Sequence, residues 1–143
     1  MKKAVIFDID GTLAQKSESR TYREYSKVAL DIPISGVINV LRLYVASGYA
    51  IVLLTGRKEY SRQDTIDWLE KHISTSDVKF SVEHLFMRPD KLHTKAEVLK
   101  QDIFTKQIKP FFDIDTAYED DLNVRAMWRK LGIATPDLAC ALS

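Results

Sequence analysis

The stretch Lys3-Ala4-Val5-Ile6-Phe7-Asp8-Ile9-Asp10-Gly11-Thr12-Leu13 decides how the chain begins to fold. Residues 4–7 are apolar without alternation, which is typical of a parallel strand covered on both faces. Asp8 ends this run, and Asp10 follows two residues later, so both side chains share a side of an extended segment. We therefore expect a buried first strand that brings two carboxylates to its carboxyl end.

The rest of the chain alternates short apolar runs with helical periodicity. Strands are predicted at 50–54, 85–87 and 111–118, and helices at 33–47, 61–73, 94–108 and 124–131. Ser61 and Thr94, each followed three residues later by an acidic residue, resemble the first residue of a capping box. The alternation predicts an α/β fold: a single doubly wound, Rossmann-like parallel sheet flanked by helices.

Length and composition limit the classes of protein. The predicted sheet and helices use nearly all of the 143 residues, so we expect one domain, 1–143, without a sizeable cap domain. The longest apolar run, 49–54, is far shorter than the roughly 18 residues of a membrane-spanning helix. One cysteine, Cys140, excludes an internal disulfide and fits a reducing compartment, so we expect a cytoplasmic protein. The 21 basic and 20 acidic residues do not indicate a nucleic-acid-binding protein, although a local basic patch would suffice.

Polar residues follow three of the predicted strands, at the edge where ligands bind in open parallel sheets. These are Asp8 and Asp10, then Thr55, Gly56 and Arg57, and finally Glu119, Asp120 and Asp121. Lys95 lies in the first turn of the helix after the third strand. Carboxylates that share a cleft repel unless a cation neutralises them, and Mg²⁺ suits oxygen ligands combined with a phosphate. Metal, lysine and hydroxyl together indicate phosphoryl chemistry.

These residues also resemble the motifs of the haloacid dehalogenase superfamily of phosphatases. Asp8-Ile9-Asp10-Gly11-Thr12-Leu13 is similar to the first motif, DxDGT. Leu53-Leu54-Thr55-Gly56-Arg57, Lys95 and Glu119-Asp120-Asp121 resemble the second, third and fourth motifs in the family's order.

The resemblance implies a mechanism. Asp8 would attack phosphorus and become an aspartyl phosphate, while Asp10 would protonate the leaving oxygen and later deprotonate water. Asp8, the backbone carbonyl of Asp10, and Asp120 would hold Mg²⁺, with Glu119 behind them. Thr55 and Gly56 would contact the phosphoryl group, and Lys95 would offset its charge.

A closer resemblance concerns the substrate. Residues 64–69, 86–89 and 112–132 are similar to the 3′-phosphatase domain of phage-type polynucleotide kinases, which implies a nucleic-acid 3′-phosphate as the substrate. It also implies that Arg20 and Arg57 contact the phosphate. Two positions depart from that family: Asp121 replaces an arginine, and Lys91 replaces the acidic residue four before the lysine. No GxxxxGK[ST] phosphate loop is present, so this sequence contains no kinase motif.

Three other functions stay open at this stage. One is a phosphatase for free nucleotides or other small phosphate esters. The second is a regulatory domain that accepts a phosphoryl group on an aspartate without turning it over. The third is a non-catalytic binding module. The position of Asp8 after the first strand, with a second acid at Asp10, favours the enzyme. The sequence does not indicate the oligomeric state or whether a separate kinase partner exists.

Overall fold

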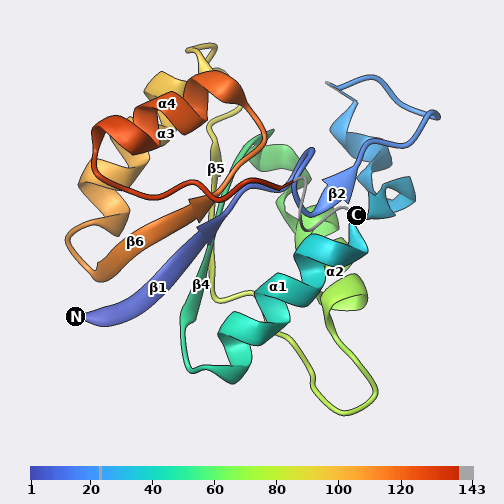
Figure 1. Cartoon of the computed structure of the whole chain (residues 1–143). Helices are drawn as coiled ribbons and strands as arrows, with labels where there is room; N and C mark the ends of the chain where they lie inside the picture. The colour runs from blue at the N-terminus through green and yellow to red at the C-terminus, as the bar shows by residue number, and fades with distance from the viewer. Residues whose placement is uncertain (23, 139–143) are drawn as a thin grey trace.

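The computed structural model describes residues 1–22 and 24–138, and a parallel sheet forms its centre (Figure 1). The strand order is β5-β4-β1-β6. The strands are β1 (Lys2–Phe7), β4 (Ala50–Lys58), β5 (His84–Arg88) and β6 (Phe112–Tyr118). All three pairings are parallel, which confirms the predicted α/β sheet.

Two pairs of helices cover the two faces of the sheet (Figure 1). Helices α1 (Ser35–Ala46) and α2 (Arg62–Ile73) lie on one face, and α3 (Ala96–Ile103) and α4 (Leu122–Lys130) lie on the other. A short π-helical turn, η3 (Phe104–Ile108), extends α3. The arrangement is the doubly wound one that the alternation of strands and helices predicts.

The side chains of β1 divide the core into two layers. Val5 and Phe7 belong to the cluster that α1 and α2 cover, whereas Ala4 and Ile6 belong to the cluster that α3 and α4 cover. All four are at most 2% exposed, as the unbroken apolar run predicts for the inner strand of a parallel sheet. Because β1 lies between β4 and β6, the residue that follows it enters the middle of the sheet's carboxyl edge.

Two helix starts differ from the sequence expectation. Ser61 does not cap α2, because its hydroxyl donates to the Lys58 carbonyl oxygen at 2.8 Å. Helix α3 begins after Lys95 rather than Thr94, without a side-chain cap, so the predicted capping box is wrong. By contrast, Asp121 caps α4 by accepting hydrogen bonds from the backbone N–H groups of Asn123 and Val124 at 2.8 and 3.0 Å.

Residues 14–22 and 24–33 lie over the carboxyl edge of the sheet (Figure 1). The strands β2 (Ala14–Gln15) and β3 (Ile32–Pro33) pair antiparallel, and a 3₁₀ segment, η1 (Tyr25–Leu30), lies between them. Segment η1 contacts α2 and a second 3₁₀ turn, η2 (Glu59–Ser61), which follows β4. This segment therefore stands beside the residues that end β1 and β4.

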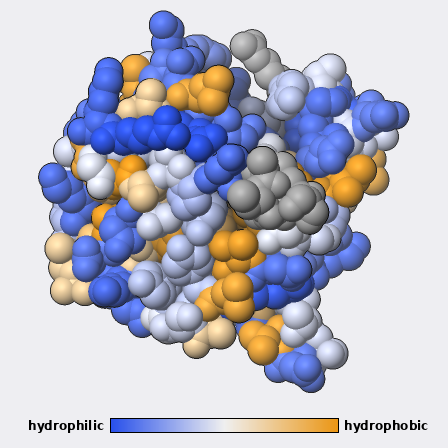
Figure 2. All heavy atoms as spheres, in the orientation of Figure 1, coloured by the Kyte–Doolittle hydropathy of each residue, from blue (hydrophilic) through white to orange (hydrophobic). Residues whose placement is uncertain are grey.

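Hydrophilic residues cover most of the face seen in Figure 2. Among the described helices, none has the length and apolar character needed to cross a membrane. The expectation of a reducing compartment is based on Cys140, which lies outside the described residues.

Candidate active site

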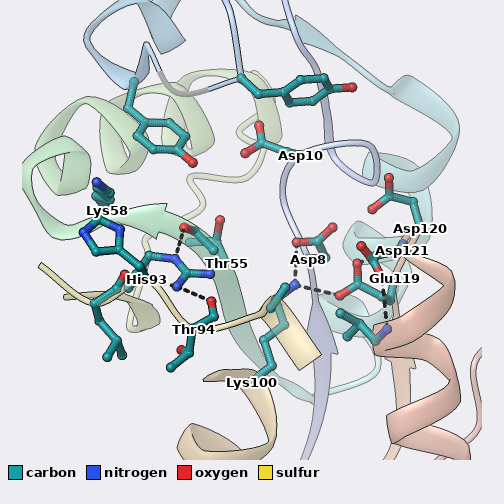
Figure 3. A pocket seen from close by; sticks show the side chains of 17 residues that line it. Asp8, Asp10, Thr55, Lys58, His93, Thr94, Lys100, Glu119, Asp120 and Asp121 are labelled. Carbon is teal, nitrogen blue, oxygen red and sulfur yellow. Dashed lines mark hydrogen bonds and ion pairs between the residues drawn. The ribbon is translucent and has the colours of Figure 1, made fainter. Parts of the chain in front are cut away.

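The polar residues at the strand ends line one cavity of about 490 Å³ (Figure 3). Asp8 follows β1, Thr55 belongs to the last part of β4, and Asp120 follows β6. The structure therefore brings together residues from three segments that are far apart in the sequence. The cavity lies at the carboxyl edge of the sheet, where open α/β sheets bind their ligands.

The buried carboxylate of Asp8 accepts hydrogen bonds from two side chains. Its backbone N–H donates to the Tyr118 carbonyl oxygen at 2.9 Å and so continues the pairing of β1 with β6. Its Oδ1 accepts from Lys100 Nζ at 2.9 Å, and its Oδ2 accepts from the Thr12 hydroxyl at 3.2 Å. Burial raises the pKa of Asp8, but the charge of Lys100 and the hydrogen bonds outweigh it, so the net pKa lies below its usual value. Asp8 is therefore ionised at neutral pH, as a nucleophilic carboxylate must be.

Lys100, and not Lys95, is the lysine of this cavity. Its ammonium group is buried and donates to Asp8 Oδ1 and to Glu119 Oε1, at 2.9 and 2.7 Å. Burial lowers the pKa of Lys100, but the two carboxylates raise it by a larger amount, so the net pKa lies above its usual value. Lys95 is exposed at the start of α3 and does not line the cavity. The structure thus places the predicted Lys95 outside the site.

The position of Lys100 on α3 explains the difference. Ala96, Leu99 and Ile103 form the inner face of this helix, and Lys100 follows Ala96 by four residues on the same face. A lysine inside an apolar helical stripe is expected to be buried against an acidic partner, because an unpaired buried charge is costly. That signal was present in the sequence and marks Lys100 rather than Lys95.

Glu119 and Asp120 complete an acidic cluster with Asp8. One carboxylate oxygen from each of the three residues lies within 4.8 Å of the others. Burial and the charge of Asp8 raise the pKa of Glu119 to about 9, although Lys100 opposes the shift. Burial and Asp8 also raise the pKa of Asp120 to about 7. Both shifts show that the cluster has more negative charge than its surroundings compensate.

The donor set of this cluster fits a divalent cation. Three carboxyl groups surround one ammonium, so ionisation of all three would leave a net negative charge that a dication would cancel. The ligands are all oxygens and few in number, which is how proteins hold Mg²⁺ together with water and a substrate phosphate. The predicted ligands Asp8, Glu119 and Asp120 converge in the structure. The predicted contribution of the Asp10 carbonyl stays a prediction.

The carboxylate of Asp10 faces a different set of partners. Arg57 donates from Nη2 to Asp10 Oδ1 at 2.8 Å and from Nε to Oδ2 at 3.1 Å. Arg20 Nη2 donates to Asp10 Oδ1 at 3.2 Å. Because Asp10 is still 23% exposed and lines the cavity, the arginines fix its orientation without closing it off.

Arg20 and Arg57 lie behind Asp10 and are not on the cavity surface. Both side chains are fully buried. Each also pairs with the buried carboxylate of Asp31, whose Oδ2 accepts from Arg20 at 2.7 Å and from Arg57 at 2.9 Å. This geometry does not provide the phosphate contacts predicted for these two arginines. Their Nε and Nη2 donors face Asp10 and Asp31, and the two side chains orient Asp10.

Asp31 is a further site residue that the sequence did not reveal. It also accepts from the Ser17 backbone N–H at 3.1 Å, and its own carbonyl accepts from the Trp68 indole at 2.9 Å. Its local sequence, before Ile32-Pro33, has the appearance of an ordinary turn. Only the fold shows that it faces two arginines from distant segments.

Thr55 and Gly56 lie in the cavity as predicted. The Thr55 hydroxyl is buried and accepts from the Arg57 backbone N–H at 3.1 Å, which leaves its own hydrogen free to donate. The Gly56 carbonyl accepts from Arg88 Nε at 3.1 Å, and Arg88 also donates to the carbonyls of Leu92 and Thr94. Arg88 thus connects the end of β4 to the loop that precedes α3.

Gly11 permits the close approach of the first and last acidic segments. Its φ is +81°, which L side chains rarely adopt. A Cβ at this position would also overlap the carboxylate of Asp120. The glycine of the Asp8-to-Leu13 motif is therefore required both for the turn and for the placement of Asp120.

This arrangement can transfer a phosphoryl group to a carboxylate. Asp8 offers an ionised oxygen, Asp10 offers a second carboxyl group on the same cavity, and Lys100 and Thr55 offer hydrogen-bond donors. Nucleophile, acid–base group and positive charge are the components of such a reaction.

Comparison with known proteins agrees with this geometry. The family model for the polynucleotide kinase PNKP phosphatase domain matches residues 2–140. A protein of Autographa californica nuclear polyhedrosis virus, assigned by name as a bifunctional polynucleotide kinase/RNA ligase, is 31% identical over 140 residues. This match covers 96% of the present chain but only 19% of the viral protein.

Solved structures show the same fold. A chain of the Pnkp1/Rnl/Hen1 RNA repair complex has a TM-score of 0.83 and 29% identity, with 94% of this chain and 41% of that chain covered. D,D-heptose 1,7-bisphosphate phosphatase from B. bronchiseptica, solved with magnesium and phosphate, has a TM-score of 0.63 and 18% identity. The second match covers 93% of this chain and 78% of that chain, and it shows the fold alone.

The family match spans nearly the whole chain, and the cavity contains the acidic, lysine and threonine groups that a phosphatase needs. The chain belongs to the polynucleotide kinase PNKP phosphatase-domain family of the haloacid dehalogenase superfamily.

Proposed function

We propose that this chain removes 3′-phosphates from nucleic-acid ends, with Mg²⁺ as cofactor and an aspartyl phosphate on Asp8 as intermediate. The observation that carries the proposal is the shared cavity of Asp8 and Asp10. Asp8 is held ionised beside Lys100, and Asp10 is oriented by Arg57 and Arg20. Two carboxyl groups with different surroundings suit different roles, one as nucleophile and one as acid–base group.

The first half-reaction transfers the phosphoryl group to the protein. An Asp8 oxygen forms a bond to phosphorus while the bond from phosphorus to the 3′-oxygen breaks. Asp10 donates its proton to that leaving oxygen, which departs as a hydroxyl group. Thr55 and Lys100 donate hydrogen bonds to the phosphoryl oxygens as negative charge develops on them.

The second half-reaction releases inorganic phosphate. Asp10, now deprotonated, accepts a proton from a water molecule that attacks phosphorus, and the bond from Asp8 to phosphorus breaks. The Asp8 carboxylate and the protonated Asp10 are thereby both restored. When bound by Asp8, Glu119 and Asp120, Mg²⁺ supplies positive charge that reduces repulsion between the carboxylates and the phosphoryl oxygens.

The nucleic-acid substrate is supported by the relatives. One relative is named for a polynucleotide kinase and RNA ligase, and another belongs to an RNA repair complex. The chain spans about a fifth of the first and two fifths of the second, so it corresponds to one part of each. The printed names of these two relatives support a substrate with a nucleic-acid end.

A substrate panel tests the proposal. Phosphate release is measured with 3′-phosphorylated DNA and RNA oligonucleotides, a 3′-mononucleotide and an aryl phosphate, each with and without Mg²⁺. We expect the oligonucleotides to give the highest kcat/KM, and chelation to abolish release. Equal rates on all substrates would contradict the 3′-end assignment, and activity in the metal-free protein would contradict the cofactor.

The nucleophile has its own test. Asp8→Asn should lower kcat by at least about 10⁴-fold, because an amide cannot form the intermediate. Circular dichroism would show that the variant is folded. Persistence of turnover in folded Asp8→Asn would exclude Asp8 as the nucleophile.

A further inference from the structure

Besides the acidic residues Asp8, Glu119 and Asp120, two aromatic residues line the cavity, and we call them the tyrosine wall. They are Tyr22 and Tyr25, and both come from the segment that folds over the carboxyl edge of the sheet. Neither residue is needed to explain phosphoryl transfer. At about 490 Å³ the cavity also lies within the range of roughly 300 to 1,000 Å³ that proteins use for whole small molecules, so it has room beyond a phosphate group.

Tyr25 is the fixed part of this wall. Its ring packs against the Tyr60 ring of η2, with centroids 6.0 Å apart. The guanidinium carbon of Arg20 lies 5.9 Å from the centroid of the Tyr25 ring. Arg20 is in turn held by Asp31 and Asp10, so the tyrosine wall and the orientation of Asp10 depend on the same buried ion pairs. The wall is thus positioned relative to the reacting groups.

Tyr22 is the accessible part. Its side chain is 69% exposed, and Lys16 Nζ lies 5.5 Å from the ring centroid. A large aromatic ring left exposed at the edge of a cavity offers an apolar face that water solvates poorly. Lys16 lies over one face of the ring and places a positive charge beside it, which favours a planar group stacked on the other face with a negatively charged backbone nearby.

Charge is distributed unevenly around the cavity (Figure 3). Asp120 and Asp121 lie at one side, whereas Lys58 and His93 lie at the other. Arg88 also lines the cavity. A substrate whose terminal phosphate reaches Asp8 would be repelled by the acidic side unless a cation is present there, so its remaining part extends toward the tyrosines and the basic side.

We propose that Tyr22 stacks on the nucleobase of the terminal nucleotide, so that the cavity binds a nucleoside 3′-phosphate unit and not only its phosphate. This inference rests on the proposed function and adds a base-binding subsite to it. Stacking of a base on an aromatic side chain tolerates all bases, because every base has a π face. The subsite therefore contributes affinity without sequence preference.

A missing base provides the test. The wild-type protein is assayed with two 3′-phosphorylated oligonucleotides that are identical except that the terminal nucleotide of one is abasic. We expect the base to lower KM about tenfold, in the range given by stacking of one base, with kcat nearly unchanged. In Tyr22→Ala the ratio of the two KM values should fall to about one, and in Tyr22→Phe, which keeps the ring, it should stay about tenfold.

A matched control is Phe111→Ala. Phe111 is also an exposed aromatic residue, 65% exposed, but it precedes β6 at the opposite edge of the sheet. This variant should retain the wild-type ratio. Because Tyr22 is exposed, its removal does not open a cavity in the core. The ratio of the two KM values is taken within each variant, so it does not depend on the total activity of that variant.

The outcomes separate the two proposals. If the wild-type protein hydrolyses neither oligonucleotide but hydrolyses small esters, the proposed function fails. If it hydrolyses both with equal KM, the function stands and the base-binding subsite is rejected. A base effect that persists in Tyr22→Ala also rejects the subsite at Tyr22.

Discussion

Single residues decide which charged groups reach the reacting centre. Lys95 and Lys100 are five residues apart, yet only Lys100 contacts Asp8, because it shares the inner face of α3 with Leu99. The identities of Asp8, Asp10, Thr55, Glu119 and Asp120 could be read from the sequence because each follows or ends a strand. The lysine does not follow a strand, so it had to be identified instead from the apolar stripe of its helix, which includes Lys100 and not Lys95.

The two lysines give a direct prediction. Lys100→Ala should lower kcat by about 10² to 10³-fold, because it removes a donor to the developing phosphoryl charge. Lys95→Ala should change kcat less than about twofold, since exposed residues away from the site rarely matter. Steady-state assays on both variants check this, with circular dichroism to show that each is folded. A larger loss in Lys95→Ala than in Lys100→Ala would contradict the geometry of the cavity.

Two glycines allow backbone strain to be separated from a metal effect. Gly11 and Gly48 have similar φ values, +81° and +84°, but only at Gly11 would a Cβ overlap Asp120. Each change to alanine should destabilise the fold by about 1 kcal/mol through strain. Only Gly11→Ala should also weaken Mg²⁺ binding, because Asp120 must move. Denaturation and Mg²⁺ titration of both variants measure the two effects, and equal Mg²⁺ affinities would refute the role of Gly11.

Among the elements, the segment from β2 to β3 differs most from the sequence prediction. Residues 15–32 have no strong periodicity and read as loop with some helix. In the structure they form η1 and place Asp31 between two arginines. The sheet and the four helices were predictable because apolar periodicity encodes them. Buried ion pairs between distant segments have no comparable local pattern, which is why Arg20 and Arg57 were predicted to contact phosphate and are found to orient Asp10.

Asp31 tests the importance of these ion pairs. Asp31→Asn should lower the free energy of unfolding by about 3 kcal/mol, because two buried arginines lose a charged partner. Asp113→Asn is the control: Asp113 is exposed on β6, and its loss should cost less than about 0.5 kcal/mol. Chemical denaturation measures both. A stability of Asp31→Asn equal to that of the control would show that the ion pairs do not support this segment.

At the scale of the whole molecule, stability and metal binding should be linked through pH. The pKa of Asp120 is raised to about 7, so folding favours its protonated form. That stabilising contribution is fully present below pH 3.8, the usual pKa of the group, and is lost progressively as the pH rises from there through about 7. Mg²⁺ binds the ionised form of Asp120. Below pH 7 its binding must displace one proton, so the affinity of the protein for Mg²⁺ should fall about tenfold for each pH unit.

Thermal unfolding measures this linkage. Mg²⁺ should raise the melting temperature more at pH 8 than at pH 6, because binding to the folded state stabilises it in proportion to affinity. In Asp120→Asn the difference between the two pH values should become smaller but not vanish, because the pKa of Glu119 is raised to about 9 and this second ligand must still lose a proton. An equal increase at both pH values in the wild-type protein would exclude Asp120 as the titrating ligand.

The pairing of β1 with β6 has a consequence for biosynthesis. Asp8 follows the first strand of the sheet, whereas Glu119 and Asp120 follow β6, the last strand of the sheet to be synthesised. A nascent polypeptide that has not yet exposed β6 lacks one of the two neighbours of β1 and two of the three residues of the acidic cluster. The candidate site is therefore complete only after β6 has emerged, and products truncated before Glu119 should be inert.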